Sequence, residues 1–220
     1  MGLKCGIVGL PNVGKSTLFN CLSSAKAQAA NFPFCTIEPN IGTIVVPDAR
    51  LNKLEELVKP ERVQANVMEI VDIAGLVKGA STGEGLGNMF LGNIRETDAI
   101  LHVIRCFDDD NVIHVDGSIN PIRDKETIDF ELQLKDLDTI DKRLEKASKM
   151  TKHGDKDAIK LVAILDQVKQ TLLQGKSARS VKLSEEDAAV LAELNLITAK
   201  PVLYVCNVDE KSLPKNGNAY

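Results

Sequence analysis

Tryptophan is absent from the 220-residue sequence, and aromatic residues make up only 4% of it. Proteins that bind single-stranded nucleic acid stack bases on aromatic side chains, so this composition argues against such a platform. The net charge of −4 gives no general attraction to nucleic acid, and any such contact must come from a local basic patch. We therefore expect no sequence-specific DNA partner.

The five cysteines include no C-x-x-C pair. An odd, scattered set that lies mostly in apolar segments indicates reduced thiols, and argues against a disulfide framework or a zinc site. No apolar run approaches the length of a membrane span, and the N-terminus leads directly into an apolar strand without a secretory signal. We expect a cytoplasmic protein with no membrane partner.

A glycine-rich stretch between a strand and a helix is the most informative feature that is present. Residues 9–17 (GLPNVGKST) follow an apolar run, Leu3 to Val8, and precede a helical pattern over residues 18–22. This order is typical of a phosphate-binding P-loop, in which glycines let backbone N–H groups turn toward a phosphate. Lys15 would contact the β- and γ-phosphates and the Ser16 hydroxyl would bind Mg²⁺. The predicted phosphate-binding residues are Val13, Gly14, Lys15, Ser16 and Thr17.

Two later segments have the composition of nucleotide-sensing switches. Thr36 lies in a loop between Pro33 and Pro39, and it is either a γ-phosphate and Mg²⁺ sensor or an ordinary loop threonine. Asp72 follows the predicted strand over residues 66–71 and begins an Asp-x-x-Gly string that ends at Gly75. There Asp72 would hold Mg²⁺ through water and the Gly75 N–H would contact the γ-phosphate. The predicted metal-binding residues are Ser16, Thr36 and Asp72.

The residue after this string is Leu76, where Ras-like enzymes carry the glutamine that orients the attacking water. Leucine forms no hydrogen bond through its side chain, so hydrolysis must be slow or use another group. His114 lies in an acidic loop beyond the predicted central strand over residues 99–106, at the edge where α/β sheets bind ligands. It is either a base for that water or a loop histidine folded over the strand. The candidate catalytic residues are Lys15, Gly75 and His114.

The alternation of strands and helices predicts a three-layer α/β fold of the P-loop NTPase (G-domain) type, with a mainly parallel sheet. His102, inside the central strand, is then expected to be a buried core histidine. Helices are also expected over residues 48–58, with Asp48 as N-cap, and from Ser184 onward, with Ser184 as cap.

Beyond Pro121 the chain becomes a pair of charged helices, which we interpret as an inserted antiparallel, coiled-coil-like hairpin. The first helix places Phe130, Leu134, Leu137 and Leu144 near a heptad seam, and the return helix offers Ala158, Leu161, Leu165, Val168 and Leu172. The predicted division is residues 1–122 with 197–220 for the NTPase domain and 123–196 for the insert. One face carries Lys142, Arg143, Lys146, Lys149 and Lys152, which is either a solvated surface or a contact for RNA.

A last strand, over residues 201–206, ends in Asn207-Val208-Asp209-Glu210. GTPases carry Asn-Lys-x-Asp at this place, and that aspartate accepts two hydrogen bonds from guanine. Here Val208 replaces the lysine and Glu210 replaces the aspartate. The change argues against strict GTP specificity without proving a preference for ATP.

Taken together, these motifs resemble the Obg-like ATPase (YchF) family of translation-factor-related P-loop NTPases, over residues 9–17, 31–40, 72–87 and 199–210 and the hairpin. The resemblance implies ATP preferred over GTP, with Asn207, Val208 and Glu210 at the base. It implies Mg²⁺ as cofactor, K⁺ stimulation through Asn12, a hydrophobic residue at Leu76, a role for His114 and association with ribosomes.

The family's nucleotide domain continues past this signature with further helices and a strand, and a C-terminal TGS domain follows. The present sequence has ten residues after Glu210, so we expect an incomplete nucleotide domain with weaker base recognition and reduced solubility.

Three functions remain open from the sequence. The first is a ribosome-associated ATPase that acts as a slow conformational switch in translation or stress regulation. The second is an Obg-type GTPase in ribosome assembly. The third is a nucleotide-gated binding module with little hydrolysis.

Overall fold

The computed structural model describes residues 2–23, 40–73, 86–109, 111–152, 154–212 and 220. The strands of these residues are β1 (Lys4–Val8), β2 (Asn40–Val45), β3 (Val67–Asp72), β4 (Ala99–Cys106) and β5 (Val202–Val208). The helices are α1 (Lys15–Ser23), α2 (Ala49–Val58), α3 (Leu86–Arg95), α4 (Pro121–Thr151), α5 (Lys156–Leu173) and α6 (Glu185–Ala192), with short 3₁₀ turns η1 (Ala178–Ser180) and η2 (Ile197–Ala199). None of the described helices is long and apolar enough to cross a bilayer.

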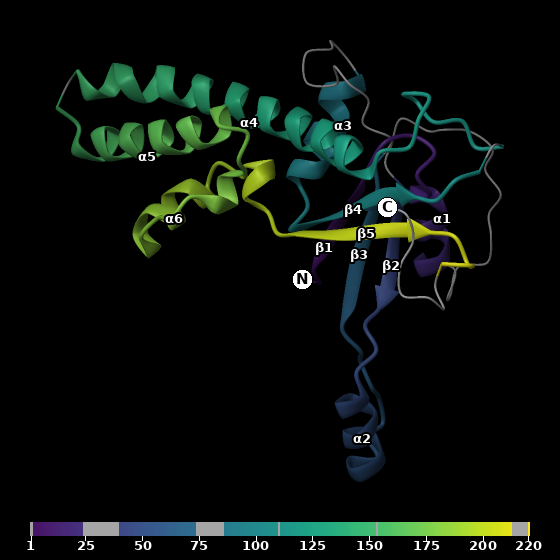
Figure 1. Cartoon of the computed structure of the whole chain (residues 1–220). Helices are drawn as coiled ribbons and strands as arrows, with labels where there is room; N and C mark the ends of the chain where they lie inside the picture. The colour runs from purple at the N-terminus through teal and green to yellow at the C-terminus, as the bar shows by residue number, and fades with distance from the viewer. Residues whose placement is uncertain (1, 24–39, 74–85, 110, 153, 213–219) are drawn as a thin grey trace.

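The strands form one sheet in the order β2-β3-β1-β4-β5 (Figure 1). β1 pairs in parallel with β3 and β4, β4 pairs in parallel with β5, and only β2 is antiparallel to its neighbour. The carboxyl ends of β1, β3, β4 and β5 therefore meet at one edge of the sheet, where the P-loop begins. The α/β fold with a mainly parallel sheet is confirmed.

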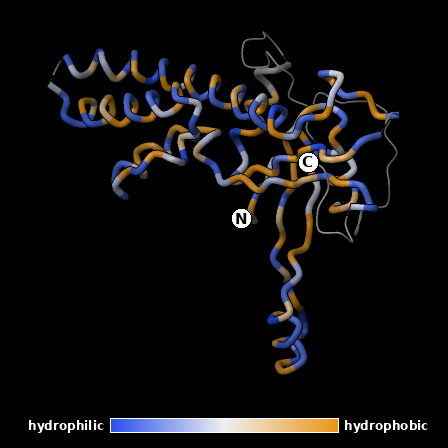
Figure 2. The backbone as a smooth tube through the Cα atoms, viewed as in Figure 1, coloured by the Kyte–Doolittle hydropathy of each residue, from blue (hydrophilic) through white to orange (hydrophobic). Residues whose placement is uncertain are grey.

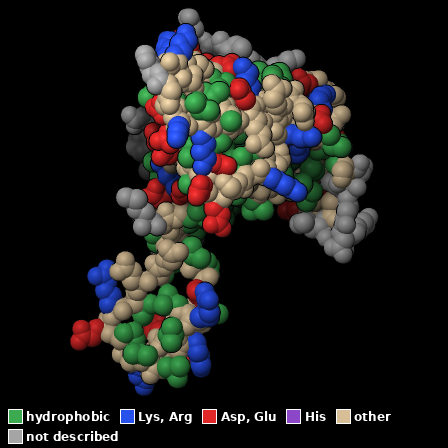
Figure 3. All heavy atoms as spheres, turned by 90° about the vertical axis from the view of Figure 1, so that its left-hand side faces the viewer, with side chains coloured by type: hydrophobic (Ala, Val, Ile, Leu, Met, Phe, Trp, Pro, Cys, Tyr) green, Lys and Arg blue, Asp and Glu red, His purple; other side chains and the backbone are tan. Residues whose placement is uncertain are grey.

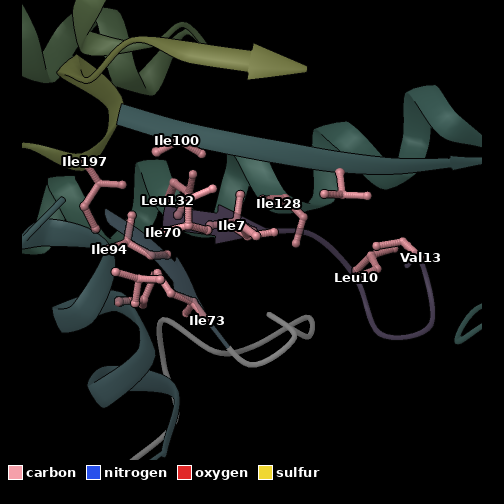
Figure 4. Close-up of a cluster of buried hydrophobic side chains, with 14 residues drawn as sticks. Ile7, Leu10, Val13, Ile70, Ile73, Ile94, Ile100, Ile128, Leu132 and Ile197 are labelled. Carbon is pink, nitrogen blue, oxygen red and sulfur yellow. The ribbon is translucent and has the colours of Figure 1, made fainter. Parts of the chain in front are cut away.

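The main core lies where these strands meet the helices (Figure 4). Ile7 and Ile70 from β1 and β3 are fully buried with Ile94 of α3 and Ile128 of α4. α1 packs on β2, where a Cβ on Gly42 would lie 3.2 Å from the Phe19 ring. Burial is nearly continuous along β1 and β4, as expected for the central strands of a parallel sheet.

The predicted helical hairpin is present, because α4 and α5 run antiparallel and project to one side of the sheet (Figure 1). The seam expected on its return helix is confirmed. Leu161 packs against a second hydrophobic cluster, formed between α4 and α5 and called the hairpin cluster below. The other four seam residues are buried: Ala158, Leu165, Val168 and Leu172. The seam expected on α4 is wrong at Phe130, which is 57% exposed. The buried apolar residues of that half are Ile128 and Leu132, since it packs on the sheet and not on α5.

α4 therefore serves two hydrophobic clusters. Ile128 and Leu132 belong to the sheet cluster, while Ile140 belongs to the hairpin cluster with Leu165. Ile197, the first residue after the predicted insert, also packs into the sheet cluster. The boundaries at residues 123 and 196 stay a prediction. The sheet cluster extends across the first boundary through Ile128 and Leu132, whereas at the second boundary Leu196 belongs to the hairpin cluster and Ile197 to the sheet cluster.

Helix α2 lies at the far end of the β2–β3 pair, away from the rest of the molecule (Figure 1). Its N-cap is Asp48, as predicted, and the carboxylate accepts a hydrogen bond from the Arg50 N–H. None of its residues is buried, and Leu54, Leu57 and Val58 are 56%, 71% and 70% exposed. Figure 2 colours several residues of this projection as hydrophobic, and Figure 3 shows hydrophobic side chains at its surface.

Candidate nucleotide-binding site

The P-loop, residues 9–17, follows β1 and extends into the first turn of α1. Gly9 and Gly14 have φ values of +153° and +100°. A Cβ on Gly9 would lie 2.5 Å from the Val103 carbonyl oxygen, and one on Gly14 would lie 2.5 Å from the Asn207 amide nitrogen. Both positions require glycine, because φ is positive and because a Cβ atom would collide with a neighbouring atom. The first intrahelical bond, from Leu18 N to Gly14 O, leaves the N–H groups at the start of α1 available to an anion.

Lys15 is the one buried residue of α1. Its Nζ donates to the Leu10 carbonyl oxygen at 2.6 Å, inside the loop. Burial lowers the pKa of Lys15 to about 8, and the charge of Asp72 opposes that shift. The ammonium is therefore held where a phosphate would take the place of the carbonyl as its partner.

Two of the predicted metal ligands, Ser16 and Asp72, the last residue of β3, are hydrogen-bonded to each other. The Ser16 hydroxyl donates to Asp72 Oδ2 at 3.1 Å, while Oδ1 is buried without a hydrogen-bond partner in the described part of the chain. Burial raises the pKa of Asp72, and the Ser16 bond and the Lys15 charge oppose this. A carboxylate oxygen without a partner beside a hydroxyl fits Mg²⁺, which prefers such oxygen ligands.

Three predicted site residues lie outside the described residues, namely Thr36, Gly75 and Leu76. Cys35, in the same predicted switch loop as Thr36, and His153, in the predicted turn between the two hairpin helices, lie outside them as well. The third metal ligand and the γ-phosphate contact thus stay predictions.

The proposed base-binding residues lie at the end of β5, next to the P-loop. Asn207 Nδ2 donates to the Val13 carbonyl oxygen at 3.0 Å and lies against Gly14. Val208 ends the strand, and Glu210 is exposed in the turn that follows. The structure brings Asn207 to the P-loop, and it leaves Glu210 at the surface.

The loop that carries His114 is organised by a buried arginine at the end of β4. Arg105 donates to the Val112 carbonyl oxygen at 2.8 Å, to that of Asp109 at 3.2 Å and to that of Phe107 at 3.1 Å. The P-loop holds the same segment, since Asn12 Nδ2 donates to the Ile113 carbonyl oxygen at 3.1 Å. The residue before His114 is thus bonded directly to the phosphate-binding loop.

His114 itself lies against the first turn of α4. Its Nε2 is 2.8 Å from Asp124 Oδ2, and its Nδ1 accepts a hydrogen bond from the Asp116 N–H at 3.1 Å. The His114 and Asp124 side chains are only 5% and 4% exposed. The structure therefore places the candidate base beside the P-loop, folded inward.

His102 is the core histidine that the sequence indicated. It is buried in β4, its ring lies 5.5 Å from that of Tyr204, and burial lowers its pKa to about 4. In the part of the chain that the structure describes, this imidazole forms no hydrogen bond with Lys15, Ser16 or Asp72, in keeping with a core role.

Sequence reasoning missed Arg105 and Asp124. A charged residue in the otherwise apolar β4 pattern was a usable signal for Arg105, because a buried guanidinium needs several acceptors. Asp124 gave no such signal, since an acidic residue in the first turn of a helix is ordinary.

A glycine loop at the carboxyl edge of a parallel sheet, a buried lysine and a serine–aspartate pair define a P-loop nucleotide-binding protein. The sequence profile described as 50S ribosome-binding GTPase matches residues 4–162. The chain belongs to this family, and its resemblance to the Obg-like (YchF) branch is confirmed by its relatives.

Similar proteins include the ribosome-binding ATPase YchF of Escherichia coli O157:H7, 55% identical over 216 residues, 98% of this chain and 60% of the relative. The protein of the same name from Bacillus subtilis (strain 168) is 54% identical over 210 residues, 96% and 57% of the two chains. A solved structure of the Schizosaccharomyces pombe YchF GTPase matches with a TM-score of 0.81 and 40% identity, over 100% of this chain and 60% of that one. The present chain thus spans about 60% of the length of these relatives.

Proposed function

We propose that the chain binds ATP with Mg²⁺ and hydrolyses it slowly, as a conformational switch in a ribosome-associated protein of translation or stress regulation. The observation that carries this is the cluster of Lys15, Ser16 and Asp72 beside the glycine loop. It combines a buried ammonium with a carboxylate oxygen that has no partner among the described residues. Such a pair is expensive to bury unless a charged ligand satisfies it.

The roles follow from the geometry of the loop. Backbone N–H groups from Val13 to Thr17 would bind phosphate oxygens, and Lys15 would neutralise the β- and γ-phosphates. Mg²⁺, held by Ser16, Asp72 and Thr36, supplies charge that offsets the transferred phosphoryl group. Gly75 would sense the γ-phosphate. We assign K⁺ stimulation to Asn12, an exposed P-loop residue with left-handed backbone, φ 61°.

Preference for ATP is supported by Val208 and Glu210 in place of the lysine and aspartate that bind guanine. Relatives carry the name ribosome-binding ATPase, which agrees. GTP is the alternative, because the family profile and the fission-yeast structure are both described as GTPases. Competition of ATP and GTP for a fluorescent nucleotide, at matched Mg²⁺ and K⁺, decides between them. Tighter GTP binding would overturn the ATP assignment.

Hydrolysis is assigned to His114 as the group that serves the attacking water. A binding module with little hydrolysis is the alternative, and the inward position of His114 favours it for the free protein. Single-turnover hydrolysis with and without ribosomes separates the two. A rate that stays at the uncatalysed level with ribosomes would support the binding module.

The ribosome is the proposed partner, with the hairpin as the contact surface, in the cytoplasm. The names of the relatives and the basic residues of the hairpin support this assignment.

A further inference from the structure

Both ring nitrogens of His114 are engaged within the protein. Nδ1 accepts the Asp116 N–H, so in a neutral ring the proton is on Nε2, which donates to Asp124. In this arrangement the imidazole has no free lone pair for a water proton. Because the side chain is also 5% exposed, water has little access to it.

Both carboxylate oxygens of Asp124 have hydrogen-bond partners, and one of these partners is the His114 ring. Its Oδ2 faces His114, and its Oδ1 accepts from Arg123 Nη2 at 2.8 Å and from Nε at 3.1 Å. Arg123 in turn donates to the Ser118 carbonyl oxygen at 2.6 Å. The carboxylate keeps its arginine partner when the histidine leaves, so departure of His114 does not strand a buried charge.

The segment that carries His114 is also bonded to the site of phosphate binding. Asn12 of the P-loop donates to the carbonyl of Ile113, one residue before the histidine. A movement of the P-loop around a nucleotide therefore reaches His114 through a single peptide unit. The segment is therefore held at two points, by the hydrogen bond from Asn12 of the P-loop and by the contact between His114 and Asp124.

We propose that Asp124 is a positioning residue that stores His114 away from water, and that fast hydrolysis requires the His114–Asp124 contact to break. The inference rests on the catalytic role proposed for His114. It attributes slow ATP hydrolysis by the free protein both to His114 being held against Asp124 and to Leu76, which cannot orient water.

The opposite arrangement is an active pair, in which Asp124 orients His114 for catalysis. That arrangement needs one ring nitrogen to face the reacting water. In the structure Nδ1 faces the Asp116 N–H instead. The two cases predict opposite effects of removing the carboxylate, which makes the inference testable.

The first test measures storage without reference to activity. Diethyl pyrocarbonate labelling of His114, read by peptide mass spectrometry, is compared between the unchanged chain, Asp124→Asn and Asp129→Asn. Asp129 is a matched control, because it lies on α4 and pairs with Lys125 at 2.5 Å without touching His114. We expect His114 to be labelled about tenfold faster in Asp124→Asn, the effect of losing one charge-assisted hydrogen bond, and at the original rate in the control. Equal rates of His114 labelling in both variants would contradict the proposal that Asp124 holds His114 away from water.

The second test measures single-turnover ATP hydrolysis and nucleotide affinity in the same variants. Asp124→Asn should raise the rate about tenfold with unchanged affinity, and adding His114→Ala should remove the gain. A slower rate in a folded Asp124→Asn chain would overturn storage in favour of the active pair. A gain in Asp124→Asn that survives the addition of His114→Ala would refute the catalytic role of His114 and the hydrolytic half of this inference, while the labelling result still decides storage.

A measurement on the unmutated chain covers the case in which Asp124→Asn does not fold. Nitrogen NMR of ¹⁵N-histidine protein should show His114 with a protonated Nε2 and an unprotonated Nδ1. The reverse tautomer would overturn the inference, since Nδ1 could not then accept the Asp116 N–H.

Discussion

Lys15 shows how burial prepares a residue for an anionic ligand. Its ammonium is taken out of water by the P-loop, which lowers its pKa to about 8, and it is held by one carbonyl oxygen. A bound triphosphate would favour the charged form, so binding and protonation of Lys15 are linked.

Nucleotide affinity should therefore fall as pH rises through about 8. Below this value Lys15 is already charged in the free protein, and above it binding must take up a proton. From about pH 7 to about pH 9 we expect roughly a tenfold loss of affinity. Titration calorimetry in two buffers of different ionisation enthalpy measures the proton uptake. Constant affinity over this range would contradict the linkage, and Lys15→Ala should abolish binding at both values.

Gly14 is constrained both by its backbone and by a neighbour. Gly14→Ala would place a Cβ 2.5 Å from Asn207 Nδ2 at a φ of +100°, so the P-loop and Asn207 must separate. We expect roughly a five- to hundredfold loss of nucleotide affinity, because such strain costs about 1–3 kcal/mol. Gly92→Ala in α3 is the matched control, since a Cβ there meets nothing within 4 Å. A Gly14→Ala chain that binds like the control would show that the loop adapts.

At the scale of elements, α4 is the connection between the hairpin and the sheet. Asp136 is fully buried and accepts hydrogen bonds from Ile197 N at 2.9 Å and from the N and Oγ1 of Thr198, each at 2.7 Å. Burial raises the pKa of Asp136, and the bonds from Thr198 and Ile197 oppose the shift. The carboxylate thus fastens α4 to η2, which leads into β5 and to Asn207 at its far end.

Replacing this carboxylate should destabilise the fold more than any surface change on the same helix. Asp136→Ala leaves buried N–H groups without an acceptor, and we expect the free energy of unfolding to fall by about 3 kcal/mol. Asp138→Ala, which removes a solvent-exposed pairing with Lys142, should cost less than about 1 kcal/mol. Urea denaturation of the two variants makes the comparison. Equal midpoints would show that the Asp136 contacts contribute little.

At the scale of the whole molecule, two parts project from the sheet (Figure 1). One is the hairpin, and the other is residues 46–66, which include α2 and are called the α2 arm here. α4 alone has 31 residues, about 46 Å of helix, and joins the His114 site at its first turn to the hairpin tip. On its outer face Lys142 and Lys149 pair with Asp138 and Glu145 at 2.8 and 2.7 Å. Within the described residues no ion pair involves Arg143, Lys146 or Lys152, so these three cations of the face are the ones available to a partner.

Arg143→Glu combined with Lys146→Glu should weaken ribosome binding by about tenfold or more, with a reduced dependence on salt, if the hairpin is the contact. Co-sedimentation with ribosomes over a salt series measures this. Lys53→Glu combined with Arg62→Glu makes the same change of charge on the α2 arm and serves as the control. Equal weakening by both pairs would assign the effect to net charge and not to the hairpin.

Local patterns predicted much of this molecule. The P-loop, the strand that ends at Asp72 and the cap at Asp48 depend on neighbouring residues, and each is present. Hydrophobic periodicity did not identify the element against which a helix face packs. It placed Phe130 in a hairpin seam, although that half of α4 packs on the sheet, and it could not show that the apolar residues of α2 stay exposed.

The sequence by itself determined the P-loop and the phosphate-binding chemistry that we propose for it, because glycine, lysine and serine act through spacing within one short loop. Only the tertiary structure decided what His114 can do, since Asp124, Asp116 and Asn12 reach its segment from a helix, a turn and the P-loop. Arg105 likewise organises that loop through backbone carbonyls, which carry no mark in the sequence. Contacts of this kind depend on the path of the folded chain, and residue order alone does not specify that path.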